Sequence, residues 1–327
     1  MRRALVGDVR FKPSEALRFL GGLAAAVVVL GLIALRVTSC APAPRPAPIP
    51  APPVASRVPP PAAPARPGAP PPLVSADCAA GPAAAAAANA ASLRTLPWAP
   101  FGRAEAGWET YVPLIARELH TACPPASPGF AAALERWEDA QSLPSDGVLS
   151  ADDFQRLKGV IQIRRPFVQL SARKVCPDPP SQANLEVARP GEGYGGKQIL
   201  LRPAALAAWR RMATAARAAD PRIAADPRNL TLFSGFRSPE ADAARCASER
   251  NCNGVVRAIC SPHRTGLALD MYVGQAPGYG PDSSADPNRL FMSRTPTYRW
   301  LAANADRFGF APYPFEPWHW EWTGEQP

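Results

Sequence analysis

The spacing of apolar residues predicts a group of short helices between about residues 107 and 168. In the first of them, apolar side chains recur every three or four positions, which places them on one face of a helix. A second helix is predicted around residues 130–137. Ser150 and Asp153 form a capping box for a third helix that ends near Leu157. The residues with helical spacing in the first helix are Trp108, Tyr111, Leu114, Ile115 and Leu119.

The pattern changes after about residue 196, where short apolar runs alternate with longer helical ones. In the run 266–273, Asp270 points to the opposite face from Leu269 and Met271. Short strands that are separate from the helices indicate an α+β fold, with a small mixed or antiparallel sheet flanked by helices and preceded by a small helical domain. The predicted strands are 197–201, 230–233 and 266–273, and the predicted helices are 203–219 and 297–307, the latter capped by Gly309.

The start of the chain predicts export and attachment to a membrane. Residues 1–18 are a basic leader, and residues 19–35 are an uninterrupted apolar run of 17, at the short limit for a membrane span. The positive flank stays in the cytoplasm, so the rest of the chain faces out. Val37 to Cys40 resembles a lipoprotein cleavage box, which leaves two alternatives: a retained signal anchor, or a lipid on Cys40.

The next segment is too rich in proline to build a core. Fifteen of the 33 residues in 41–73 are proline, which favours extended polyproline II and a spacer between the bilayer and the globular part. The expected organisation is therefore 1–18 cytoplasmic leader, 19–40 signal anchor or lipoprotein signal, 41–75 linker, 76–175 small helical domain and 176–327 catalytic domain.

Charge and cysteines agree with a location outside the cytoplasm. Lys and Arg number 36 against 27 Asp and Glu, a net charge of +9, which suits work near an anionic cell wall. The arginines are scattered and no nucleic-acid module is present, so we expect no nucleic-acid partner. Separately, we expect the protein to be a monomer. Of seven cysteines, six pair evenly once Cys40 is set aside. We expect Cys78 to pair with Cys123, and two further bridges among Cys176, Cys246, Cys252 and Cys260.

Two runs near the C-terminus carry the candidate chemistry. Two of the three histidines lie in them: His263 and Asp270 in the first run, Glu316 and His319 in the second. Two imidazoles and one carboxylate are the ligands of an open zinc site, whose fourth position is left for water. Non-haem iron uses the same residue types, but usually with the first histidine and the acid two residues apart rather than seven. We therefore expect Zn2+ to be bound by His263, Asp270 and His319.

The same runs resemble a known family. The motif SxHxxGxAxD at 261–270, followed by ExxH at 316–319, is similar to VanY-type D-alanyl-D-alanine carboxypeptidases, zinc peptidases that cut peptidoglycan stem peptides. The resemblance covers about residues 190–323 and implies that Glu316 is the general base. It also implies that Arg237 stabilises the oxyanion or grips the substrate carbonyl, and that Ser261 contacts the substrate carboxylate or supports the site. Asp242 stands where the family often has Gln.

A weaker resemblance concerns residues 107–160, whose helix, LPxDG and S-x-x-D-F layout is similar to three-helix peptidoglycan-binding modules. The alternative is a structural helical cap on the peptidase. His120 lies at the end of the first helix, and no role is assigned to it.

The resemblance therefore predicts a membrane-anchored, periplasmic or otherwise extracytoplasmic zinc D,D-carboxypeptidase that releases the terminal D-Ala of stem peptides. An LD-carboxypeptidase or a cross-link endopeptidase on the same site is one alternative. A non-catalytic cell-wall-binding protein is the other.

Overall fold

Helices dominate the first part of the computed structural model, which describes residues 76–250, 252 and 259–326. All of them belong to one unit, residues 69–327. The leader, the apolar run and the proline-rich linker expected at 1–75 lie outside the described residues. Within the described part of the chain, no helix is long and apolar enough to cross a membrane.

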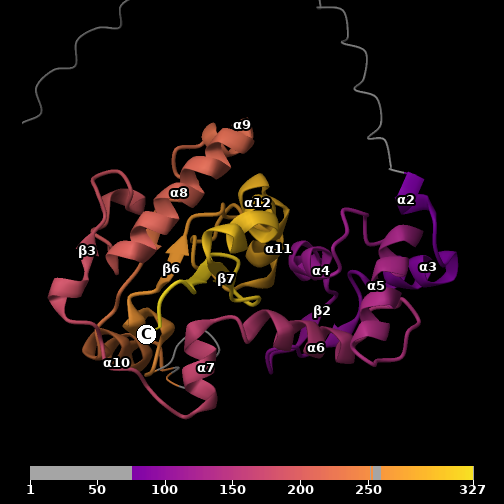
Figure 1. Ribbon diagram of the computed structural model, residues 1–327, viewed down its shortest axis with the longest axis horizontal. Coiled ribbons are helices and arrows are strands. Elements are labelled where there is room, and N and C mark those ends of the chain that lie inside the picture. The colour runs from indigo at the N-terminus through magenta and orange to yellow at the C-terminus, as the bar shows by residue number, and fades with distance from the viewer. Residues whose placement is uncertain (1–75, 251, 253–258, 327) are drawn as a thin grey trace, which may run out of the picture. The chain divides into compact units, whose positions relative to one another are not determined.

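In Figure 1 the elements of the first part up to residue 162 lie together, coloured from indigo to magenta, and the helix at residues 166–172 lies apart from them. The helices of the first part pack around a core that includes Trp108, Phe130 and Phe154. The elements are α2 (Ala76–Ala79), α3 (Ala83–Ser92), β1 (Pro97–Trp98), β2 (Glu105–Ala106), η1 (Glu109–Tyr111), α4 (Val112–Glu118), α5 (Pro128–Ala140), α6 (Ala151–Gln162) and α7 (Pro166–Ala172).

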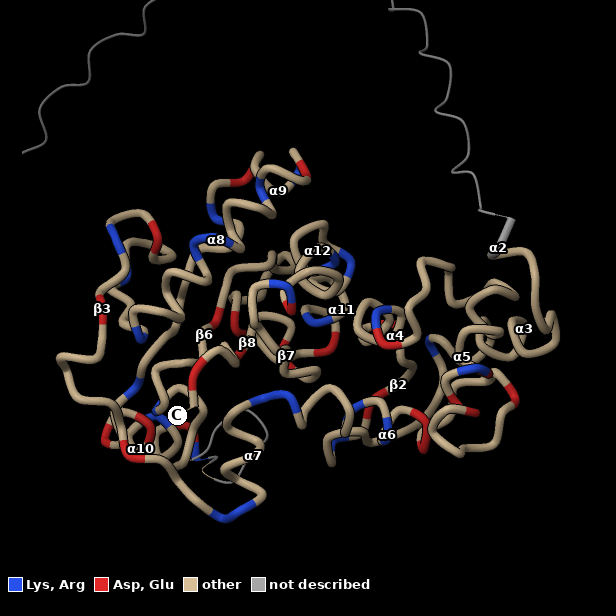
Figure 2. The backbone as a smooth tube through the Cα atoms, viewed as in Figure 1, with Lys and Arg blue, Asp and Glu red and all other residues tan. Residues whose placement is uncertain are grey.

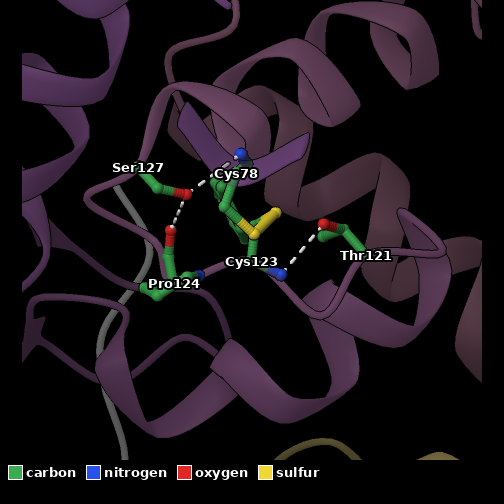
Figure 3. Close-up of a disulfide and its surroundings, with 6 residues drawn as sticks. Cys78, Thr121, Cys123, Pro124 and Ser127 are labelled. Carbon is green, nitrogen blue, oxygen red and sulfur yellow. Dashed lines mark hydrogen bonds between the residues drawn. A yellow bond between two sulfur atoms is a disulfide. The ribbon is translucent and has the colours of Figure 1, made fainter. Parts of the chain in front are cut away.

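The sequence predicted where one of these helices begins. The predicted capping box is present, since the Ser150 hydroxyl accepts from the Asp153 N–H while the Asp153 carboxylate accepts from the Ser150 N–H. The helix it begins reaches Gln162, beyond the expected end near residue 157, because the apolar stripe continues to Ile161. The predicted bridge between Cys78 and Cys123 is confirmed. In Figure 3 the Cys123 N–H donates to the Thr121 hydroxyl at 3.1 Å, which fixes the loop beside the bridge.

The second part holds the sheet. It begins with the connector elements η2 (Gln182–Asn184), β3 (Glu186–Val187), η3 (Tyr194–Gly196) and β4 (Leu200–Leu201), and continues with α8 (Pro203–Ala219) and α9 (Pro221–Ala224). The remaining elements are β5 (Leu232–Ser234), α10 (Pro239–Ser248), η4 (Pro262–Thr265), β6 (Ala268–Met271), α11 (Asp286–Arg294), α12 (Pro296–Asn304), η5 (Ala305–Phe308), β7 (Phe310–Pro312) and β8 (His319–Trp322).

Four antiparallel strands in the order β5-β6-β8-β7 form the central sheet. Apolar residues of α8 and α12 pack against it, and Figure 1 shows β6 between these two helices. The register places Asp270 of β6 opposite both Ser234 of β5 and His319 of β8. The predicted α+β class is therefore confirmed, with an antiparallel sheet.

Three local expectations were incomplete. Residues 239–248 form α10, a helix that was not predicted. It begins where the Ser238 hydroxyl accepts from the Ala241 N–H, and its Ser-Pro-Glu start is a sequence signal for a helix. Helix α11, which begins at Asp286, was not among the predicted helices. Gly266 lies before β6 rather than in it, since its φ of 70° ends η4 in the left-handed conformation.

The expected boundary near residue 175 stays a prediction. Leu114 of α4 and Ile161 of α6 belong to the same apolar cluster as the sheet residues Leu269 and Trp320. The helical part thus contributes side chains to the core under the sheet.

Candidate active site

His263 is held in a defined orientation by its own short helix. Ser261 precedes η4, and its hydroxyl accepts from the His263 N–H at 3.3 Å. The imidazole Nδ1 lies 2.7 Å from the Gly235 carbonyl oxygen, so Nδ1 carries the proton and donates to that oxygen. A side chain at position 235 would not fit, because its Cβ would lie 2.4 Å from the Leu200 carbonyl oxygen. Nε2 of His263 is thereby left to bind a ligand and lies 3.3 Å from Asp270 Oδ2.

Asp270 and His319 meet because β6 and β8 pair in register. His319 Nδ1 lies 2.9 Å from Asp270 Oδ1. The opposite ring nitrogen, Nε2, lies 3.7 Å from Glu321 Oε1, which is longer than an ordinary hydrogen bond. One ligand atom from each of His263, Asp270 and His319 lies within 4.8 Å of the others, and all three residues are buried.

Each of the three groups is shifted from its ordinary pKa. Burial lowers the pKa of His263 to about 4, although Asp270 opposes this. Burial also acts to lower the pKa of His319, but the hydrogen bond to Asp270 and the nearby Glu321 carboxylate outweigh it and raise the value to about 9. Burial acts to raise the pKa of Asp270, yet the two histidines hold it well below its usual range. Without an ion, the cluster is therefore a carboxylate, a neutral imidazole and an imidazolium at neutral pH.

The donor set fits a small divalent ion. Two imidazole nitrogens and one carboxylate oxygen converge, and a cavity of about 220 Å³ borders all three. The orientation of each imidazole is set on its far side: His263 donates to a carbonyl, and His319 faces Glu321. Such partners behind metal-binding imidazoles are usual in zinc sites. The expected Zn2+ cofactor agrees with this arrangement.

Glu316 borders the same cavity. Its Oε2 lies 3.9 Å from His319 Nδ1, and its side chain is nearly buried. A turn fixes it, because the Glu316 N–H donates to the Tyr313 carbonyl and the Glu316 carbonyl accepts from the His319 N–H. The carboxylate therefore stands beside the three residues of the cluster, on the border of the cavity that they share.

Arg237 and Ser261 also line this cavity. The Arg237 guanidinium donates to Asp242 at 3.1 Å and to the Ser234 hydroxyl at 3.2 Å, and its backbone N–H donates to the His263 carbonyl. Asp242, the position that departs from the family pattern, thus orients Arg237. The structure brings together every residue that the sequence suggested for the site.

Other groups at the site were not foreseen. Arg165, which lies between α6 and α7, pairs with Glu321 at 2.6 Å, and its guanidinium lies 4.4 Å from the centre of the Tyr313 ring. Figure 2 marks basic residues where α6 leads into α7 and acidic residues along β6 and β8. Glu321 was detectable, since it follows His319 by two positions on a strand and shares its face. No sequence signal pointed to Arg165.

The two remaining cysteine bridges lie at the rim of the cavity. Cys176 pairs with Cys260, and Cys246 pairs with Cys252, as expected for two bridges among these four. Cys246 and Cys260 line the cavity.

One family model matches the part of the chain that holds this site. Residues 198–325 match the family model VanY: D-alanyl-D-alanine carboxypeptidase. A solved structure, a variant of the vancomycin-resistance D,D-pentapeptidase VanY from a VanB-type cassette in complex with Zn(II), is 22% identical with a TM-score of 0.27. The match covers 45% of this chain and 83% of that one. No curated protein matches. The family match confirms the resemblance predicted from the sequence: residues 198–325 match a domain of the VanY family of D-alanyl-D-alanine carboxypeptidases.

Proposed function

We propose that this protein is a zinc-dependent D,D-carboxypeptidase that releases the terminal D-alanine of peptidoglycan stem peptides. The observation that carries the proposal is the pairing of β6 and β8, which sets Asp270 against His319 Nδ1 while His263 presents Nε2 to the same carboxylate. Glu316 stands 3.9 Å from His319 Nδ1, on the border of the same cavity.

The ligands would be His263 Nε2, an Asp270 oxygen and His319 Nδ1, and the ion they hold supplies Lewis acidity and lowers the pKa of water to about 7. Glu316 accepts the proton of the attacking water and passes it to the leaving amine of D-alanine. Arg237 donates to the oxygen of the scissile carbonyl, where negative charge develops. The Ser261 hydroxyl supports His263 by accepting from the His263 backbone N–H, and it also contacts the substrate carboxylate.

The substrate of this family lies outside the cytoplasm. We infer that the chain is tethered to the membrane by its N-terminal apolar run or by a lipid on Cys40, and that it acts as a monomer. The net charge of +9 favours the approach to an anionic wall.

The test is D-alanine release by the purified full-length protein from a pentapeptide ending in D-Ala-D-Ala, with and without a chelator. Glu316→Gln removes the base, and Glu138→Gln is the matched control, since Glu138 is also buried but is not among the residues that line the cavity. Release that requires metal and Glu316, but not Glu138, supports the proposal.

Other substrates separate the alternatives. Release only from a peptide ending in an L,D bond would show that the enzyme is an LD-carboxypeptidase. Cleavage only of cross-linked muropeptides would show that it is an endopeptidase. Zinc binding without hydrolysis of any of these substrates would favour a wall-binding protein.

A further inference from the structure

A helix from outside the family domain lines the active-site cavity. The VanY match begins at residue 198, yet Phe167, Val168 and Ser171 of α7 border the cavity. Ser171 lies one turn beyond the other two, at i+4 from Phe167 and i+3 from Val168, so it is a neighbour of both on the helix surface. Phe167 and Val168 are half-buried, so part of their apolar surface faces the cavity. Residues 165–176 are called the strap below.

The first end of the strap is fixed to the strand that carries a metal ligand. Arg165 and Glu321 are 6% and 2% exposed and lie 2.6 Å apart. The second oxygen of Glu321 accepts from the Phe167 N–H at 2.9 Å. Glu321 thus holds both the residue before α7 and the first turn of α7, two positions from His319.

The second end of the strap is fixed to the motif that carries the other histidine. Cys176 is bonded to Cys260, and Ser261 and His263 follow directly. A segment that only connected two parts of the chain would need neither attachment. Both attachments end at the site, so they set the position of α7 relative to the metal ligands.

The strap adds apolar surface to the cavity, in addition to that of Tyr313 and Trp318, which also line it. Apart from the ligands, several lining side chains are charged, among them Arg237, Arg245 and Asp282. A stem peptide ending in alanines has a carboxylate that suits the two arginines and methyl groups that need an apolar contact. Phe167 and Val168 offer such a surface.

We propose that the strap is a substrate-binding wall of the active site, on which Phe167 and Val168 contact the alkyl side chains of the peptide beside the scissile bond. This inference rests on the proposed peptidase function. It assigns part of the specificity to residues that precede the family domain, and therefore to the helical part of this chain.

The test compares Phe167→Ala with Phe308→Ala in the full-length protein, since Phe308 is also half-buried but packs against Trp300 rather than lining the cavity. Two measurements are made: KM and kcat for D-alanine release, and the Kd of a fluorescent D-Ala-D-Ala pentapeptide for the zinc-loaded Glu316→Gln protein with each substitution added. Loss of a partly buried phenyl contact should raise KM and Kd roughly five- to tenfold, with kcat little changed. Phe308→Ala should leave both constants unchanged.

The attachment is tested with matched pairs of cysteines. Replacing Cys176 and Cys260 together by Ser frees the second end of the strap, whereas replacing Cys78 and Cys123 removes a bridge in the helical part. The first replacement should raise Kd, and the second should lower the melting temperature without changing Kd.

The outcomes separate the two proposals. Equal KM and Kd in Phe167→Ala and Phe308→Ala, with D-alanine released normally, would overturn the strap and leave the carboxypeptidase standing. If Phe167→Ala binds the peptide more weakly but the unsubstituted protein releases no D-alanine, the role of the strap is supported and the proposed carboxypeptidase activity is wrong. A peptide that neither binds nor is cleaved would overturn both.

Discussion

Two regions of this molecule bury carboxylates, and only one of them builds a site. In the helical part, the Glu138 side chain is fully buried and its Oε2 accepts from the N–H groups of Asp146 and Gly147. Burial raises its pKa to about 7. At the sheet, Asp270 is also buried, but it faces two imidazoles and a cavity. A buried charge alone is therefore no sign of function; the convergence of several donors on an accessible space is.

The largest expected effect separates Glu316 from Glu138. Glu316→Gln should lower kcat for D-alanine release by about 10²- to 10⁴-fold, because a positioned general base contributes that much. The bound zinc, measured by metal analysis, should stay at the level of the unsubstituted protein. An equal loss of kcat in Glu138→Gln would show that the two buried carboxylates do not differ in their effect on catalysis.

Zinc affinity should depend steeply on pH. His319 has a pKa of about 9 and His263 of about 4 without metal, so between these values binding must displace one proton, from His319. The zinc association constant should therefore rise about tenfold per pH unit from pH 5 to 8. Calorimetric titrations in buffers of different ionisation enthalpy count the released protons. A pH-independent constant would contradict this charge distribution.

Arg165 tests whether Glu321 acts on the metal through His319. Arg165→Met should weaken zinc binding by about 10- to 100-fold, the usual effect of losing a group behind a metal-binding histidine. It should also destabilise the fold by about 3–5 kcal/mol, since Glu321 would remain buried without its partner.

Arg210→Met is the control for Arg165, because Arg210 pairs with Glu192 at 2.8 Å and does not line the cavity. It should lower stability less, because its pair is more exposed, and leave zinc affinity unchanged. Competition with a metal indicator dye gives the affinities, and chemical denaturation gives the stabilities. Equal zinc affinity in both variants would reduce Arg165 to a structural role.

The smallest effect concerns stability at Glu138. Its folded pKa of about 7 lies above the ordinary value of 4.5, so the folded state holds the extra proton between these values. The associated stability is present below pH 4.5 and is lost as pH rises through 7; the loss is about 1–3 kcal/mol. Glu138→Gln should flatten this part of the stability profile between pH 5 and 8, measured by urea denaturation at low salt. A profile as steep as that of the unsubstituted protein would assign the dependence to other groups.

What the sequence revealed follows from how local each signal is. Helix α8 was predicted with its observed bounds, because Pro203 and a regular apolar stripe mark it. The metal cluster was predicted because its residues carry recognisable chemistry within two short runs. Arg165 and Glu321 are 156 positions apart in the sequence, and their contact depends on tertiary packing. No local sequence pattern therefore predicts it. The Cys78–Cys123 bridge was predicted only from the position of both cysteines in the N-terminal part of the chain.

The antiparallel pairing of β6 and β8 makes the metal centre a test of correct folding. Side chains alternate along a strand, so a slip by one residue would set Trp320 rather than His319 against Asp270. A misregistered sheet would keep much of its backbone bonding and yet lose a ligand. Zinc would therefore bind tightly only to molecules whose two strands have aligned correctly, and metal uptake during refolding would report the fraction that has done so.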